Sequence, residues 1–167
     1  MATVVGLNTI KANIKTLLNA ANTIGASPVD LSNSMTSRVK KVLAVHPASI
    51  PIQASHYPYV SCYIAGKPIT SDDIAKDQLS TKRKSKVQID IVGGVFNQNV
   101  TDITKDPADE DISYLMENIE LILRSDPTLS NSVLYQKPIE CSYYSNLVGS
   151  NAHLRLGILR IEALVFY

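Results

Sequence analysis

The stretch DPADEDISYLMENIELILRSDP, residues 106–127, constrains the fold more than any other part of the sequence. Asp106 suits the N-cap, Pro107 suits the first helical position, and the acidic side chains at 109 to 111 lie at the positive end of the helix dipole. Arg124 and the following Pro127 end the helix. One continuous apolar stripe comprises Ile112, Leu115, Met116, Ile119, Ile122 and Leu123. The stretch therefore predicts a long helix that packs on other elements through one face.

A second amphipathic helix is predicted over residues 7–23, where Gly25 and Pro28 end the pattern. Three prolines between Pro47 and Pro58 exclude a helix interior or a central strand there, so we expect an extended surface connector. Valine-rich or alternating segments predict strands at 37–47, 57–66, 81–95, 132–146 and 152–167. The last two strands flank a turn at 148–151 and predict a hairpin.

This order of elements, α-β-β-β-α-β-β, predicts an α+β fold in which a mostly antiparallel sheet of about five strands packs with two main helices. The chain of 167 residues fits a single domain, residues 1–167. Between the second and third strands the sequence is polar and long, and we expect a projecting arm at about residues 66–86.

The predicted last strand is apolar on both faces. Leu159, Ile161, Ala163 and Val165 share one face. The opposite face carries Leu154, Leu156, Ile158, Leu164 and Phe166 around Arg160 and Glu162. Two explanations are equally compatible with this pattern: the second face contacts another subunit, or the two helices cover opposite faces of the sheet.

Composition excludes several classes of protein. With 45% hydrophobic and 19% charged residues and a formal net charge of +1, the chain has no global attraction to nucleic acid or anionic lipid. The N-terminus lacks a signal-peptide pattern, and no apolar run is long enough for a membrane span, so we expect synthesis and use in a cytoplasm. Cys62 and Cys141 are far apart in apolar strands, which favours two buried free thiols.

No motif for catalysis or metal binding is evident. The histidines at 46, 56 and 153 lack metal-ligand spacing, and the His56 to Cys62 separation does not identify a catalytic pair. Gly93 and Gly94 lack a phosphate-loop motif and indicate sheet geometry. The acidic residues at 106 to 111 lack calcium-loop spacing, so helix capping explains them. We therefore expect no enzyme activity and no cofactor.

The most unusual local feature is the cluster of basic residues Lys82, Arg83, Lys84 and Lys86, with Lys67 and Lys76 earlier in the expected arm. A cluster of this kind is commonly a solvated loop end. Repeated around a ring, it could instead follow a DNA backbone without reading bases, since no aromatic side chains interleave with the lysines. It could equally pair with acidic residues of a protein partner.

Taken together, these elements resemble bacteriophage tail terminator proteins, also called tail completion proteins. The resemblance spans nearly the whole chain. It is carried by the amphipathic first helix, the strand YPYVSCYI, the strand KVQIDIVGGV entered from a basic loop, the helix DISYLMENIELILRSDPTL and the terminal strand LRLGILRIEALVFY.

The resemblance implies a virion structural protein without enzymatic activity, made in the host cytoplasm. It implies a hexameric ring of this chain on the last ring of the tail tube, where it ends tube growth and presents a docking surface to the neck or head-completion protein. A contractile tail would add the sheath as a partner, and DNA would pass non-specifically through the lumen. Phe166 and Tyr167 would lie near an edge available to a partner. Two rivals are a head-tail joining or head-completion protein and a small-molecule-binding or enzymatic α+β domain.

Overall fold

The structure, a computed structural model, describes residues 6–49, 53–67, 84–98, 106–148 and 152–166. Its helices are α1 (Leu7–Ala21) and α3 (Pro107–Ser125), with two short 3-10 helices, η1 (Pro47–Ser49) and η2 (Ala54–His56). Its strands are β1 (Lys41–Leu43), β2 (Tyr59–Gly66), β3 (Lys84–Gln98), β4 (Tyr135–Val148) and β5 (Ala152–Phe166). The α+β class and the predicted element order are confirmed. The expected arm lies almost entirely outside the described residues.

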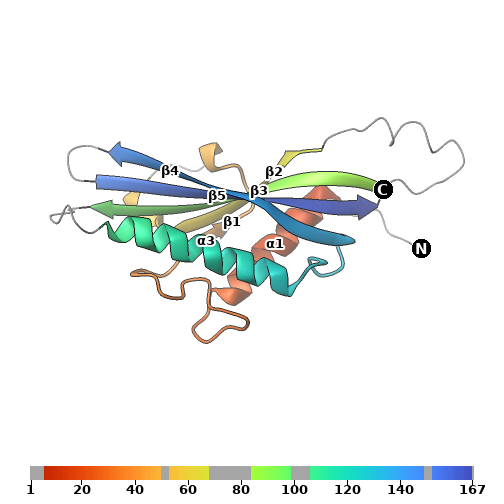
Figure 1. The fold of residues 1–167 in the computed structure, drawn as a ribbon, viewed down its shortest axis with the longest axis horizontal. Coiled ribbons are helices and arrows are strands. Elements are labelled where there is room, and N and C mark those ends of the chain that lie inside the picture. The colour runs from red at the N-terminus through yellow and green to blue at the C-terminus, as the bar shows by residue number, and fades with distance from the viewer. Residues whose placement is uncertain (1–5, 50–52, 68–83, 99–105, 149–151, 167) are drawn as a thin grey trace, which may run out of the picture.

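The five strands form one sheet in the order β1-β2-β3-β5-β4. β1 pairs with β2 in parallel, and all other neighbours are antiparallel. β3 and β5 pair over their full length, from Lys84 opposite Phe166 to Gln98 opposite Ala152. These two long strands form the centre of the sheet, whereas β1 and β4 form its two edges (Figure 1).

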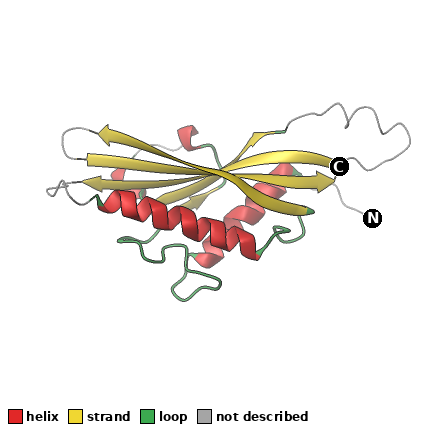
Figure 2. Cartoon of the chain, in the orientation of Figure 1, coloured by secondary structure: helices red, strands yellow, loops and turns green. Residues whose placement is uncertain are grey.

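Both helices lie on the same face of the sheet, as Figure 2 shows. Ile10, Ile14 and Leu18 of α1 belong to the same buried cluster as the apolar stripe of α3. The sheet contributes its inward-facing residues to that cluster, including Val87, Ile89, Ile91, Val95, Leu159, Ile161, Ala163 and Val165. The expectation that the helices could cover opposite faces is therefore wrong, because the two apolar stripes share one core.

The N-terminal cap of α3 forms as the sequence predicts. The Asp106 carboxylate accepts the Ala108 N–H at 3.1 Å. Asp111 has a different role: it is buried, and it accepts the Thr36 N–H at 2.8 Å, which fastens the loop before β1 to the helix. The acidic cluster thus combines capping with one structural tether.

The connector between β1 and β2 covers part of the second face. Tyr57, Tyr59 and Leu154 form a small buried cluster there, against which Phe96 packs. The Ser61 hydroxyl donates to the Val45 carbonyl and holds the start of the connector on the sheet. The connector is not simply extended, as the sequence analysis expects, because it contains η1 and η2.

The strand expected at 37–47 is only three residues long. Before β1, the Val39 carbonyl accepts from the Asn22 side chain at 2.9 Å and the Val39 N–H donates to Ser32 Oγ at 2.9 Å. After β1, the Val45 carbonyl accepts from Ser61. Side-chain hydrogen bonds thus use the backbone N–H and C=O groups that would otherwise pair with a neighbouring strand if β1 were longer.

Several other boundaries differ by a few residues. β2 begins at Tyr59 rather than at 57, and β4 spans Tyr135–Val148 rather than 132–146. α1 ends at Ala21 rather than at 23, where the N–H of Asn22 donates to Leu18 O at 3.0 Å. β3, described over Lys84–Gln98, ends at Gln98 rather than at 95, because the polar residues Asn97 and Gln98 still pair with β5; residues 81–83 lie outside the described residues.

The paired glycines of β3 lie in regular register with both neighbouring strands and permit close packing of side chains on both faces of the sheet. A Cβ at Gly93 would lie 2.9 Å from Leu115 Cδ2 of α3. A Cβ at Gly94 would overlap the ring of Tyr59 on the other face. Glycine at position 94 makes room for the Tyr59 ring, whereas the atoms near position 93 are the flexible ends of Leu115 and Met116.

Candidate assembly interface

Three described members of the two residue groups predicted for assembly, Lys67, Lys84 and Phe166, lie at the same end of the sheet. Lys84 is the first residue of β3 and pairs through its backbone with Phe166 of β5. Lys67 is exposed and directly follows β2, at the same end of the sheet. The side chains of Lys84 and Phe166 lie outside the described part of the chain, as do the whole residues Lys76, Lys82, Arg83 and Tyr167. In the described part of the chain, the backbones of basic residues and of the C-terminal end of β5 therefore lie at the same end of the sheet.

Lys86 is the one residue of the predicted basic cluster whose side chain the structure describes. It lies on the second face and forms an ion pair with Glu162, Nζ to Oε1 3.2 Å. Lys137 of β4 approaches the same carboxylate oxygen at 4.0 Å. The charge of Lys86 is therefore partly neutralised within the chain, as expected for a solvated surface ion pair.

A buried carboxylate organises the centre of the second face. Asp90 is 3% exposed and accepts two hydrogen bonds from Arg160, at 2.7 and 2.9 Å, and one from the Tyr63 hydroxyl at 3.2 Å. These contacts raise the pKa of Arg160, while burial, followed by the nearby Asp90 charge, raises the pKa of Tyr63. The His46 ring contacts Tyr63 in a tilted arrangement, with ring centroids 4.4 Å apart and an interplanar angle of 58°. The network satisfies its own polar atoms, which suits a structural role.

The edge strand β4 carries the main exposed aromatic surface. Tyr143 and Tyr144 are 53% and 54% exposed, and the alternation along the strand places them on opposite faces of the sheet. Ile139 and Tyr135 on the same strand are 49% and 42% exposed. α3 packs chiefly over β3 and β5, so β4 extends beyond its cover. β4 is therefore a strand edge that neither helix covers, and it carries large exposed side chains on both of its faces.

The β4 edge was not among the surfaces predicted from the sequence. The sequence pattern identified the apolar second face from β5, whereas the largest exposed side chains belong to β4. A usable signal for an edge strand was Pro138, because proline within a strand is confined to edges or bulges. The strand order shows that β4 lies at an edge.

The two cysteines have different environments. Cys62 is fully buried, and burial raises its pKa to about 11, as expected for a core thiol. Cys141 is exposed on β4, so the prediction that it is buried is wrong: an edge strand beyond α3 lacks cover. Desolvation nevertheless raises the pKa of Cys141, although a hydrogen bond with Tyr143 opposes the shift, and the raised pKa disfavours the thiolate at neutral pH.

The flank of α3 next to β4 is acidic. Glu117 and Glu120 are close enough to Tyr143 to contribute to the raised pKa of its hydroxyl, after the larger effects of burial and of Cys141. Glu120 is itself paired with Arg124, Oε1 to Nη2 2.6 Å. A partner on this edge therefore meets an aromatic strand bordered by carboxylates.

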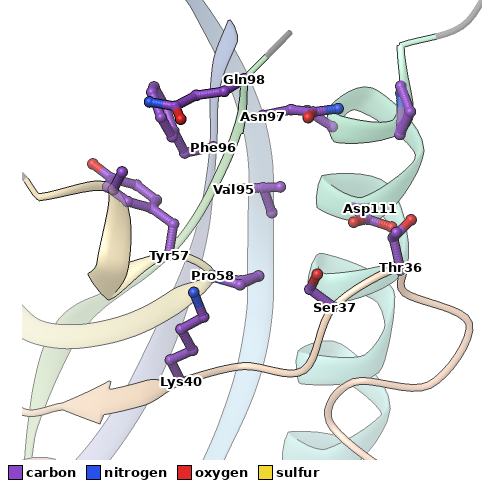
Figure 3. A pocket seen from close by; sticks show the side chains of 13 residues that line it. Thr36, Ser37, Lys40, Tyr57, Pro58, Val95, Phe96, Asn97, Gln98 and Asp111 are labelled. Atoms are coloured by element: carbon purple, nitrogen blue, oxygen red, sulfur yellow. The ribbon is translucent and has the colours of Figure 1, made fainter. Parts of the chain in front are cut away.

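A cavity of about 220 Å³ lies between the connector, the end of β3 and α3 (Figure 3). Its polar lining includes Lys40, Tyr57, Gln98 and Asp111, which approach it from different elements. The Asp111 oxygen that faces Thr36 already accepts a backbone N–H. The volume is below the roughly 300–1,000 Å³ of typical small-molecule sites.

Within the described residues, no three His, Cys, Asp or Glu side chains are arranged so that they could hold a metal ion. In the same part of the chain, no helix has the length and apolar character needed to cross a membrane. No known family model matches the chain, and no curated protein matches it.

Proposed function

We propose that this protein is a virion structural protein of a tailed bacteriophage. It forms a hexameric ring at the head-proximal end of the tail tube, ends tube polymerisation there and provides the docking surface for the neck. The proposal rests on the resemblance of the element order and motifs to tail terminator proteins. The observation that supports an assembly role most directly is the uncovered β4 edge, with its exposed tyrosines on both faces.

The physical basis is the difference between a lone chain and a closed ring. A free strand edge leaves backbone donors and acceptors unpaired and can recruit another chain. In a ring each subunit contacts the next one head-to-tail, so when the ring closes, the β4 edge of every subunit is covered by a neighbour. The end of the sheet formed by Lys67, Lys84 and Phe166 supplies a second surface on the same subunit. The basic arm would contact a neighbour, the tube or the DNA channel.

Electron microscopy of particles that lack this protein tests the proposal. Overlong tails are expected, because nothing would end tube growth. Normal-length tails detached from heads would contradict it and favour the head-tail joining alternative. Counting subunits on purified tails supplies an independent test, with six expected.

The cavity of Figure 3 favours a second candidate, a domain that binds a small polar molecule. A ligand that binds the folded state raises the melting temperature by mass action. A thermal scan against a metabolite panel, repeated with Lys40→Ala and Asp111→Asn, would identify such a ligand. A stabilisation that both substitutions abolish would favour this candidate over the ring.

A further inference from the structure

The edge strand β4 consists of two unlike halves. Its first half has features that discourage pairing with another strand: Lys137, Pro138, a register shift between Pro138 and Glu140, and the charge of Glu140. The second half, residues 141–146, is uncharged, contains no proline and pairs with β5 in continuous register. The second half is therefore a template for an added strand.

The other strand edges in the described part of the chain are less suitable. β1 is three residues long, with exposed lysines at 40 and 41. Beyond β1, the edge of β2 has a register shift between Ile64 and Gly66. The edge of β3 beyond β2 includes Lys84 and Lys86. Short length, irregular register and charge all oppose edge pairing, so the best matched partner for residues 141–146 is the same stretch of a second copy.

We propose that free chains pair through residues 141–146 of β4 in an antiparallel two-fold dimer. Antiparallel pairing about a two-fold axis perpendicular to the sheet joins two five-stranded sheets into one and keeps all helices on the same side. In this arrangement, residues directly opposite each other have their side chains on the same face. Because side chains alternate between faces along a strand, the numbers of two opposite residues are both odd or both even. Centring the uncharged stretch places Tyr143 opposite Tyr143 of the second copy, and Cys141 opposite Ser145.

The helices leave room for this arrangement. α3 lies over β3 and β5, about two strand spacings from the two-fold axis, so the two α3 axes would be roughly 20 Å apart. Helices in direct contact are separated by about 8–10 Å. The space between them therefore accommodates the two Tyr143 rings, while Tyr144 of each copy covers the other face of the joined sheet.

The acidic flank of α3 limits the strength of this dimer. Glu117 and Glu120 of both copies would border the Tyr143 pair. Arg124 pairs with Glu120, with 2.6 Å between Nη2 and Oε1. Like charges near one another oppose association. Replacing Glu117 by glutamine should therefore tighten the dimer, which a random surface contact would not require.

Dimerisation would also regulate the proposed ring, and this part of the inference rests on the proposed function. A two-fold contact uses the β4 edge of both copies, so the same edge is closed to a head-to-tail neighbour. The dimer would hold free subunits in a form that cannot polymerise, and it must separate before a ring closes.

Disulfide trapping tests the dimer and its register. Directly opposite residues in an antiparallel pair have Cα atoms about 4.5–5.5 Å apart, within disulfide range. Under oxidised glutathione, Ser145→Cys should therefore give a covalent dimer through the native Cys141 of the second copy. Asn146→Cys is the matched control: its side chain lies on the opposite face from Cys141, and it should stay uncrosslinked, as should the unsubstituted chain.

Analytical ultracentrifugation over a concentration series provides the second measurement. The unsubstituted chain should dimerise, and Glu117→Gln should lower the dissociation constant several-fold. Tyr143→Glu should abolish dimers, whereas Tyr135→Glu, at a similarly exposed tyrosine outside the paired stretch, should leave them intact. A chain that stays monomeric throughout, or crosslinking of Asn146→Cys as efficient as that of Ser145→Cys, would overturn the dimer.

The trapped Ser145→Cys dimer separates this inference from the proposed function. It should fail to end tail growth until a reductant releases it. If the dimer forms but tails lacking the protein have normal length, the ring proposal fails and the dimer stands. If trapped dimers cap tails as well as reduced chains do, the regulatory role is wrong.

Discussion

The two sides of the sheet differ in how fully the chain covers them. On the β1 and β2 side, α1 packs on one face and the connector packs on the other, so Val60, Ser61 and Cys62 are all fully buried. On the β4 side, α3 reaches β5 but hardly extends over the edge strand, and Tyr143 and Tyr144 are more than half exposed. The first side is completed within the subunit, whereas the second is available to another chain.

This contrast separates residues that maintain the fold from residues available for contacts. Substitutions on the covered side should change the free energy of unfolding and leave association largely unchanged. Substitutions on β4 should do the reverse. The largest change in the free energy of unfolding is expected at the centre of the covered side, and the smallest is expected on β4.

The largest loss is expected for Ile91→Ala. Ile91 is fully buried at the centre of the sheet, and truncating such a side chain costs about 2–5 kcal/mol because it leaves a cavity. Ile139→Ala on β4 is the matched control and should cost far less, since Ile139 is 49% exposed. Urea unfolding measures both. Equal losses would mean that β4 is buried as deeply as β3.

Alkaline pH should weaken the covered side through Cys62. Burial raises the pKa of Cys62 from 9.0 to about 11, so the folded state binds this proton more tightly than the unfolded state does. The resulting stability is present below pH 9 and is lost as pH rises through 11, with a limit of about 2–3 kcal/mol.

Comparing the pH dependence of unfolding with that of Cys62→Ala isolates this contribution, because both proteins share their tyrosines. The substituted protein should lose less stability between pH 9 and 11. Parallel curves would show that the Cys62 thiol does not control the alkaline transition.

A smaller loss is expected when the network on the second face is broken. Asp90→Ala removes a buried acceptor for Arg160 and Tyr63 and should cost about 1–3 kcal/mol in thermal or urea unfolding. Asp109→Ala removes an exposed carboxylate 3.6 Å from Arg155 and should cost under about 1 kcal/mol. A reversed order would mean that solvent, and not Asp90, satisfies Arg160.

The smallest effect on stability is expected for Tyr144→Ser. Tyr144 is exposed, and substitutions at exposed positions without a special structural role usually change the free energy of unfolding by less than about 0.5 kcal/mol. The same substitution should weaken self-association, which light scattering can follow. A large loss of stability with unchanged association would show that Tyr144 maintains the fold and does not contribute to contacts with another chain.

The sequence predicts the covered side well because periodicity reports burial. The apolar stripe of α3 and the alternation in β3 and β5 identify the core residues correctly. Asp106 caps its helix as expected from its position before Pro107. These features depend on local spacing along the chain, so a linear reading recovers them.

The same reading fails where strand order decides exposure. Cys141 lies in a strand with many β-forming residues, and Pro138 is the local sign that this strand is an edge, but its exposure follows from the strand order. Placing both helices on one face likewise depends on packing between elements far apart in sequence. The shortened β1 depends on the side chains of Asn22 and Ser32, which compete for its backbone.

Backbone amide exchange of residues 141–146 tests most directly whether the β4 edge is a contact surface. The outward N–H groups of a free edge exchange quickly, and pairing with another chain slows them. Exchange in this stretch should slow between the dilute chain and the protein on purified tails, whereas exchange in Tyr59–Gly66 should stay unchanged. Equal exchange of residues 141–146 in both states would contradict the account.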